Sequence, residues 1–144
     1  FEKIFLMDNF GVILSEEKPE HQHLPLIVQS SKSVKPENFS GDKVIQSLKT
    51  MHYFNKLSFF EKNPLEIAEL KGHSRIIFFT DNRDIQIQMS MERLTEGFKK
   101  FMIVLDTLED DAGKFQKIDL SFKDQVVVRD RISNHSRSLK TPTK

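Results

Sequence analysis

Few residues of this sequence have the types and spacing that metal binding or acid–base catalysis requires. His21 and His23 could place two imidazoles on one side of an extended segment, but no third ligand is in view. Two solvated histidines are the simpler interpretation. Asp81 and Asp84 could form a carboxylate pair, yet Asp and Asn are also the residues that a tight turn selects for backbone reasons. Neither pair predicts a reaction.

Other signatures of chemistry are weak or missing. The acidic cluster Glu109–Asp111 could hold a hard cation, but it lacks the spacing of a calcium-binding loop and is better read as solvated. The five glycines form neither GxGxxG nor GxxxxGK[ST], and no GxSxG nucleophile turn occurs. We therefore expect no cofactor and no metal.

Composition predicts one soluble globular domain. The chain has 144 residues, 38% of them hydrophobic, with 13 Phe to fill a core. Lys and Arg nearly balance Asp and Glu, 22 against 21, which argues against a nucleic-acid partner. There is no Cys for a disulfide and no apolar run near the ~20 residues of a membrane span. Because the chain begins at Phe1 without a targeting signal, we expect it to be a piece of a longer protein.

The chain pattern predicts an α+β fold, a mainly antiparallel sheet covered by two helices with a C-terminal edge strand. Expected extended segments are an opening hairpin, a short strand limited by Pro25, a three-strand meander and a closing hairpin. They fall at 4–7 with 12–14, at 24–28, at 65–70, 75–80 and 84–89, and at 115–122 with 126–129.

Apolar spacing predicts the two helices. The first covers about 42–53, with one face expected to hold Val44, Ile45, Leu48 and His52. The second is expected to be capped by Ser90, and its stripe must lie on the sheet. That stripe consists of Leu94, Phe98, Phe101, Met102, Leu105 and Leu108.

Val126, Val127 and Val128 form the last extended segment before residues 130–144, whose low apolar content predicts a disordered basic tail. If this strand lies at the border of the sheet, its free backbone groups invite a partner strand. The residues alone leave a central, fully paired position equally open. The expected domain boundary is 1–129 for the folded part and 130–144 for the tail.

Five stretches of the sequence form an ordered set. They are LMDNFGVIL at 6–14, LPLI at 24–27, DIQI at 84–87, Arg93-Leu94 with 98–108, and KIDLSFKDQVVVR at 117–129, the last of which is the longest. This ordered set resembles the β-domain of the bacterial division family FtsQ (DivIB), over about residues 1–129.

This resemblance implies a non-catalytic scaffold that binds FtsB and FtsL and helps control septal peptidoglycan synthesis. The whole protein would be anchored by one helix in the cytoplasmic membrane, with this domain on the periplasmic side, monomeric in isolation, and with a POTRA module before it. In the family, the strand that matches Val126–Val128 accepts a strand of FtsB. A small hydrolase, a ligand-binding domain, or another envelope transport or adhesion module remains the alternative.

Position by position, the resemblance implies a partner-binding set around the closing hairpin. It consists of Phe122, Lys123, Asp124, Gln125, Val126, Val127, Val128 and Arg129, with Arg75 as a second basic contact. Three positions depart from the family, which often has Arg at Ser121, Gly at Gln125 and, in some members, Trp at Asp130. Lys123 could replace the missing Arg if the strand continued through it.

Overall fold

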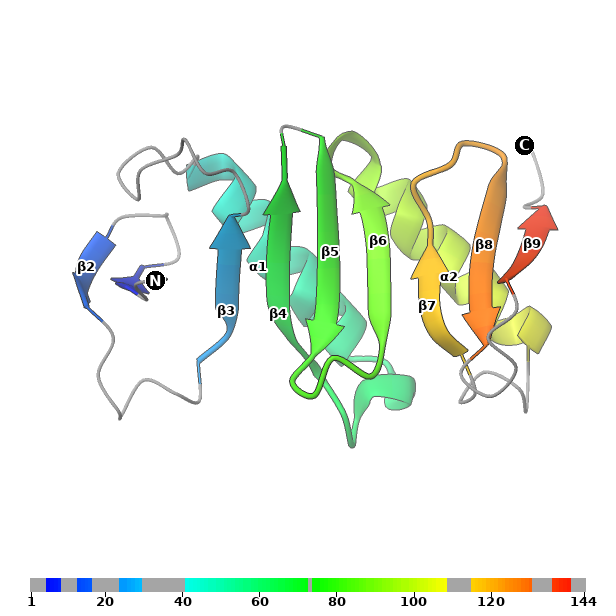
Figure 1. The fold of residues 1–144 in the computed structure, drawn as a ribbon, viewed down its shortest axis with the longest axis horizontal. Helices are drawn as coiled ribbons and strands as arrows, with labels where there is room; N and C mark the ends of the chain where they lie inside the picture. The colour runs from blue at the N-terminus through cyan, green and yellow to red at the C-terminus, as the bar shows by residue number, and fades with distance from the viewer. Residues whose placement is uncertain are drawn as a thin grey trace.

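The chain folds into one large mixed sheet with two helices on one side and a small hairpin at its N-terminal end (Figure 1). This computed structural model describes residues 5–8, 13–16, 24–29, 41–72, 74–108, 115–130 and 136–140. The predicted α+β class is confirmed. In the described residues the helices are α1 (Gly41–Asn55) and α2 (Leu94–Leu108), with short 3-10 turns η3 (Ser58–Phe60) and η4 (Met91–Arg93). The strands are β1 (Phe5–Met7), β2 (Ile13–Glu16), β3 (Leu26–Gln29), β4 (Leu65–Lys71), β5 (Arg75–Thr80), β6 (Gln86–Ser90), β7 (Phe115–Asp119), β8 (Gln125–Asp130) and β9 (Ser136–Lys140).

The hairpins and the meander that the sequence predicts are present. β1 pairs antiparallel with β2 in a separate two-stranded sheet. The other strands form a seven-stranded sheet in the order β3-β4-β5-β6-β7-β8-β9. β4, β5 and β6 pair antiparallel in succession, as do β7, β8 and β9. The sheet is therefore mainly antiparallel, with parallel pairing only at β3–β4 and β6–β7.

In each parallel pair a helix connects the first strand to the second, and this explains why both helices lie on the same face of the sheet. The chain runs from β3 through α1 to β4, and from β6 through α2 to β7. Crossovers between parallel strands are almost always right-handed, so two crossovers that step in the same direction along a sheet cover the same face. Figure 1 shows α1 and α2 together behind the sheet.

The fold repeats one arrangement that the sequence does not reveal. The order β3-α1-β4-β5 is followed by β6-α2-β7-β8, with parallel pairing across each helix and an antiparallel hairpin after it. In the first unit the far side of β5 is paired with β6, and in the second the far side of β8 is paired with β9. β9 therefore occupies the position that corresponds to β6.

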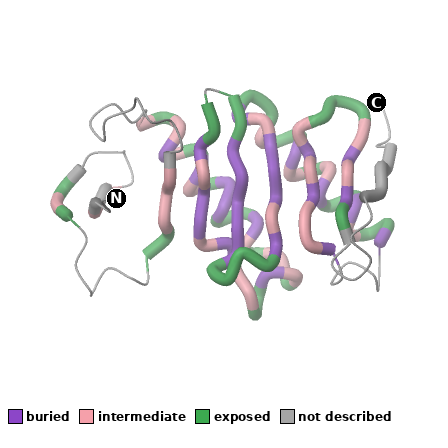
Figure 2. Tube along the Cα trace, in the orientation of Figure 1, coloured by how far each residue is buried: buried purple, intermediate pink, exposed green. Residues whose placement is uncertain are grey.

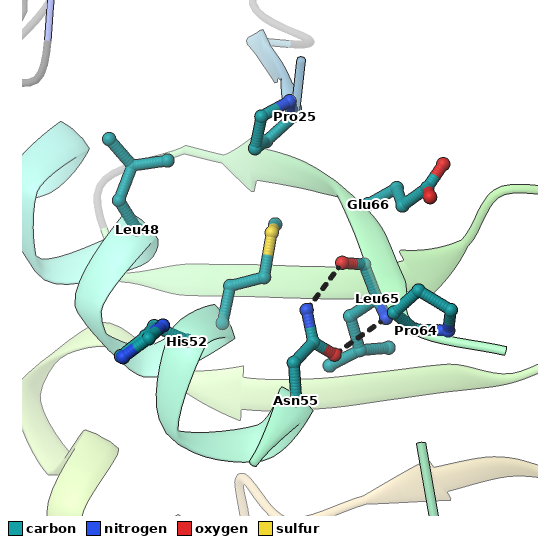
Figure 3. Close-up of a pocket in the computed structure, with 8 residues that line it drawn as sticks. Pro25, Leu48, His52, Asn55, Pro64, Leu65 and Glu66 are labelled. Atoms are coloured by element: carbon teal, nitrogen blue, oxygen red, sulfur yellow. Dashed lines mark hydrogen bonds between the residues drawn. The ribbon is translucent and has the colours of Figure 1, made fainter. Parts of the chain in front are cut away.

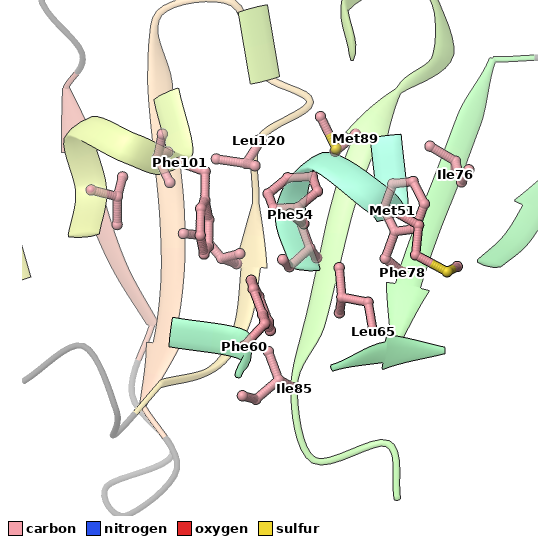
Figure 4. Packing of buried hydrophobic residues seen from close by; sticks show 14 of the residues in the cluster. Met51, Phe54, Phe60, Leu65, Ile76, Phe78, Ile85, Met89, Phe101 and Leu120 are labelled. Carbon is pink, nitrogen blue, oxygen red and sulfur yellow. The ribbon is translucent and has the colours of Figure 1, made fainter. Parts of the chain in front are cut away.

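Buried residues of the sheet and both helices form the main core (Figure 2), and aromatic rings fill much of it (Figure 4). The Phe54 ring of α1 meets Phe101 of α2 edge-on, with 5.1 Å between centroids, and Phe60 likewise at 6.1 Å. Phe59 stacks on Phe115 of β7 at 5.2 Å. Edge-on and offset contacts of this kind add to the free energy of apolar burial. These rings join both helices to one continuous core.

The buried face of α1 differs from the predicted one. It consists of Val44, Ser47, Thr50, Met51 and Phe54, whereas His52 is exposed and Ile45 and Leu48 are only half-buried. Ser47 can be buried because its hydroxyl donates to the Lys43 carbonyl one turn earlier, at 2.6 Å. A hydroxyl satisfied inside its own helix costs little to bury.

The predicted stripe of α2 is correct except at Met102. Phe101, Val104 and Leu108 are buried with Gly97, and Leu94, Phe98 and Leu105 pack partly against them, but Met102 is 40% exposed. Gly97 sits so close to β6 that a Cβ there would overlap the terminal methyl of Met89. The predicted cap is wrong, because Ser90 precedes η4 but its side chain makes no cap hydrogen bond.

The C-terminal segment corrects two predictions. The sequence favours a disordered tail after residue 129, yet Ser136–Lys140 forms β9 and pairs with β8. The strand that contains the three valines is therefore not the border of the sheet, because β7 and β9 flank it. Apolar content failed as a guide here because a strand can be ordered by backbone pairing with its neighbour, as β9 pairs with β8. The segments 131–135 and 141–144 lie outside the described residues.

Candidate protein-binding edge

The turn between β7 and β8 is fixed at its start by hydrogen bonds between Asp119 and Ser121. β7 ends at Asp119, one residue before Leu120, whose N–H donates to the Gln88 carbonyl of β6 at 2.8 Å. The Asp119 carboxylate then accepts from the Ser121 N–H at 2.9 Å and from the Ser121 hydroxyl at 2.5 Å. Such short-range acceptors are typical of Asx turns. The chain therefore leaves the sheet at Ser121, and Lys123 does not continue the strand as expected.

Two cations, Arg93 of η4 and Lys100 of α2, hold the same turn from the side, and we call them the turn anchor. Arg93 Nη2 donates to the Ser121 carbonyl at 2.8 Å, and Lys100 Nζ donates to the Phe122 carbonyl. Burial lowers the pKa of Lys100 below its ordinary value of 10.5, and the charge of Arg93 lowers it further. Glu96 and Asp124 act in the opposite direction. Each of these two like charges is thus bound by a backbone carbonyl of the turn.

The turn presents an apolar side chain to solvent. Phe122 is 45% exposed, and Lys123 and Asp124 beside it are exposed as well. Since the turn anchor fixes the backbone at Ser121 and Phe122, the ring projects from a defined position. A large ring on a fixed backbone is a common anchor in protein interfaces.

Strand β8 follows with its valines divided between the two faces of the sheet. Val126 and Val128 are fully buried on the helix side, whereas Val127 is half-buried and Arg129 is exposed. Gln125 begins the strand and is half-buried. The structure thus gathers Phe122–Arg129 into one turn and one strand, with β9 paired along the outer side.

Arg75 is not part of this group. It begins β5, and β6 and β7 lie between that strand and β8. At ~4.8 Å per strand, the separation between β5 and β8 is about 14 Å. Arg75 is exposed and pairs in register with Ser90 of β6 and Lys71 of β4.

Asp81 and Asp84, which could have formed a carboxylate pair, lie in and next to the turn between β5 and β6. Asn82 organises the turn around Asp81 and Asp84, because its Oδ1 accepts from the Thr80 hydroxyl at 2.8 Å and from the Asp84 N–H at 3.1 Å. Arg83 adopts φ 58° in this turn, and its guanidinium lies 4.6 Å from the Phe79 ring centroid. Both carboxylates therefore belong to a structural turn.

Metal binding receives no support within the described ranges. That part of the chain contains no group of three His, Cys, Asp or Glu side chains placed to hold an ion. His21, His23 and Glu109–Asp111 lie outside the described residues.

A pocket of about 370 Å³ lies between α1 and the start of β4 (Figure 3). Two of its polar groups, His52 and Glu66, lie on opposite sides. The Asn55 amide is already used, since it donates to the Leu65 carbonyl at 2.9 Å and accepts from the Leu65 N–H at 2.8 Å. Ligand and active sites need polar groups that converge, so this cavity does not favour the hydrolase alternative.

Sequence reasoning missed two contributors to the edge, the turn anchor and β9. Arg93 and Lys100 are 28 and 22 residues from the carbonyls they bind, a separation that no local pattern encodes. β9 has only Leu139 as an apolar residue, so it gives no strand signal.

Comparison of the sequence with protein-family models and with curated proteins gives no match. In the described part of the chain, no helix has the length and apolarity of a membrane span.

Proposed function

We propose that this chain is a non-catalytic protein-binding domain of the FtsQ/DivIB type, which docks FtsB and FtsL at the C-terminal end of its sheet. In the whole protein it would act on the outer side of the cytoplasmic membrane and help control septal peptidoglycan synthesis. The sequence resemblance over residues 1–129 supports the family, and its longest matching stretch, 117–129, forms the turn and strand of the candidate edge.

The observation that carries the proposal is the exposed Phe122 on a turn that side-chain hydrogen bonds hold in place, one strand away from the border strand β9. Within the described residues, the seven-stranded sheet ends at β9, with no further strand beyond it. Strand borders and aromatic anchors are the two features that peptide-binding sheets combine, the first for affinity and the second for specificity.

The test mixes the purified chain with the purified outer segments of FtsB and FtsL and measures the dissociation constant by calorimetry. We expect a 1:1:1 complex, and we expect Phe122→Ala to weaken it about ten-fold because a buried aromatic anchor is lost. Tyr53→Ala is the matched control, since Tyr53 is 56% exposed but belongs to α1 and not to the edge. Absence of a complex with the unaltered chain would refute the proposed function.

A further inference from the structure

Helix α2 leaves two adjacent apolar side chains in solvent. Met102 is 40% exposed and Ile103 is 39% exposed, although the helix covers one face of the sheet. The residues on either side of them, Phe101 and Val104, are buried in the core. The exposed pair therefore lies on the side of α2 that is turned away from the core, on the helix layer behind the sheet in Figure 1.

Opposite charges flank this apolar pair symmetrically along the helix. Lys99 lies three residues before Met102, Asp106 lies three residues after Ile103, and both charged side chains are exposed. At 3.6 residues per turn, all four side chains fall within about 100° of the helix surface, and we call them the outer face of α2. Lys99 and Asp106 are about 10 Å apart along the axis, too far to pair with each other. No ion pair joins either of them to another described residue.

We infer that the outer face of α2 pairs with the same face of a second copy of the chain, across a two-fold axis between Met102 and Ile103. In an antiparallel pair of α2 helices centred there, Lys99 of each copy faces Asp106 of the other. Met102 of each copy faces Ile103 of the other. A two-fold interface must be complementary to itself, and the order of cation, two apolar residues and anion meets this requirement.

The charges of the outer face favour a second copy over other occupants. An anionic lipid surface selects faces with an excess of Lys or Arg, whereas this face has one cation and one anion. A helix of another protein would need an acidic and a basic residue at the spacing of Asp106 and Lys99. That arrangement is present in the chain itself, so charge complementarity identifies the occupant.

The association should be weak and reversible. Four side chains per copy are far fewer than the ~20–30 residues a side of a standard interface, so the chain should be monomeric when dilute and pair when concentrated. The pairing leaves the candidate edge on another side of α2. Lys100, which binds the Phe122 carbonyl, is two residues and about 200° around the helix from Met102.

Complementary charge variants test the two-fold register. Lys99→Asp brings acidic residues together at both ends of the pair, and Asp106→Lys brings cations together there. We expect each variant alone to self-associate at least ten-fold more weakly than the unaltered chain, because like charges then face each other. An equal mixture of the two variants should pair about as strongly as two unaltered copies do, since each contact between positions 99 and 106 again joins opposite charges. Sedimentation equilibrium from about 10 µM to 1 mM covers the affinities of weak interfaces.

Lys62→Asp is the matched control, because it makes the same change of charge at an exposed residue between η3 and β4. It should leave self-association unchanged. All substituted side chains are exposed, so each variant should remain folded, and circular dichroism verifies that the helices are intact. Ile103→Asp, which removes half of the apolar centre, should abolish pairing with any of the other chains.

The outcomes separate this inference from the proposed function, on which it does not depend. If the unaltered chain stays monomeric up to about 1 mM, the pairing is refuted. If it self-associates but the mixture of charge variants does not recover the affinity, another surface is responsible and the inference is again refuted. Binding of a monomeric chain to phosphatidylglycerol vesicles, lost in Ile103→Asp, would assign the face to lipid instead. Weakening by each variant and recovery in the mixture support the two-fold pair.

Discussion

Removing the turn anchor should loosen the β7–β8 turn by an amount that the geometry predicts. Arg93→Met and Lys100→Met each delete one charged donor to a backbone carbonyl while keeping most of the aliphatic side chain. Such bonds at a partly exposed site contribute about 0.5–1 kcal/mol each. The double variant should therefore lose about 1–2 kcal/mol of unfolding free energy, out of the ~5–15 kcal/mol typical of a domain.

The two losses should not be additive. Arg93 lowers the pKa of Lys100, which means that the two cations repel each other in the folded state. Each single substitution removes a hydrogen bond but also relieves this repulsion, so its cost is smaller than the bond alone. The double variant loses both bonds and has no repulsion left to relieve. We expect its cost to exceed the sum of the two single costs by a few tenths of a kcal/mol.

Urea unfolding of the four proteins in this cycle gives the measurement, with an expected midpoint shift of about 0.5–1 M for the double variant. The reasoning is refuted if the double variant is no less stable than the weaker of the two single variants. Phe122 provides a functional readout, since its contribution to partner binding should fall when the turn that carries it is no longer held.

The same pair of cations predicts a pH effect and the core predicts three changes in stability. The folded pKa of Lys100 lies below its unfolded value of 10.5, so between these two values the unfolded chain binds more protons and the free energy of unfolding increases as pH rises. NMR titration of the Lys100 side chain should show the lowered pKa. Arg93→Gln should raise this pKa, because it removes the neighbouring charge. Phe54→Ala should cost about 3–5 kcal/mol in urea unfolding, because the ring is fully buried between both helices and the sheet. Gly97→Leu should cost about 1–3 kcal/mol despite a better helix propensity, since the new side chain would overlap the end of Met89; an unchanged melting temperature would contradict this close packing. Asn55→Ala should cost about 1–3 kcal/mol by leaving the backbone of a buried strand residue without either partner, and a loss below 0.5 kcal/mol would show that water replaces the amide.

Local patterns predicted most of the elements. Alternation of Ile87 and Met89 with glutamines marked β6 as a strand, although Gln88 is buried as well, and the valines of β8 marked another strand. The helices were predicted from their apolar spacing, although the buried face of α1 includes Ser47, which apolar spacing does not identify. These successes share one cause, since each element buries enough apolar surface to mark its own sequence.

Long-range relations were not predicted. The position of β8 inside the sheet depends on β9, a strand of two serines, an arginine, a leucine and a lysine. Its order comes from backbone pairing with a neighbour, and that information is absent from its own residues. The separation of Arg75 from the closing hairpin was not predicted for a similar reason, because strand order, which separates β5 from β8, is a property of the whole fold.

The short contact between β6 and β7 has a mechanical consequence. Only the three register pairs from Gln86 to Gln88 join these strands, fewer than at any other step of the seven-stranded sheet. A tensile load applied at the C-terminal border must pass to the rest of the molecule across this narrow junction and through α2, which spans it. Pulling on that border would therefore open the sheet between β6 and β7 first, and α2 would act as the tether that limits the opening.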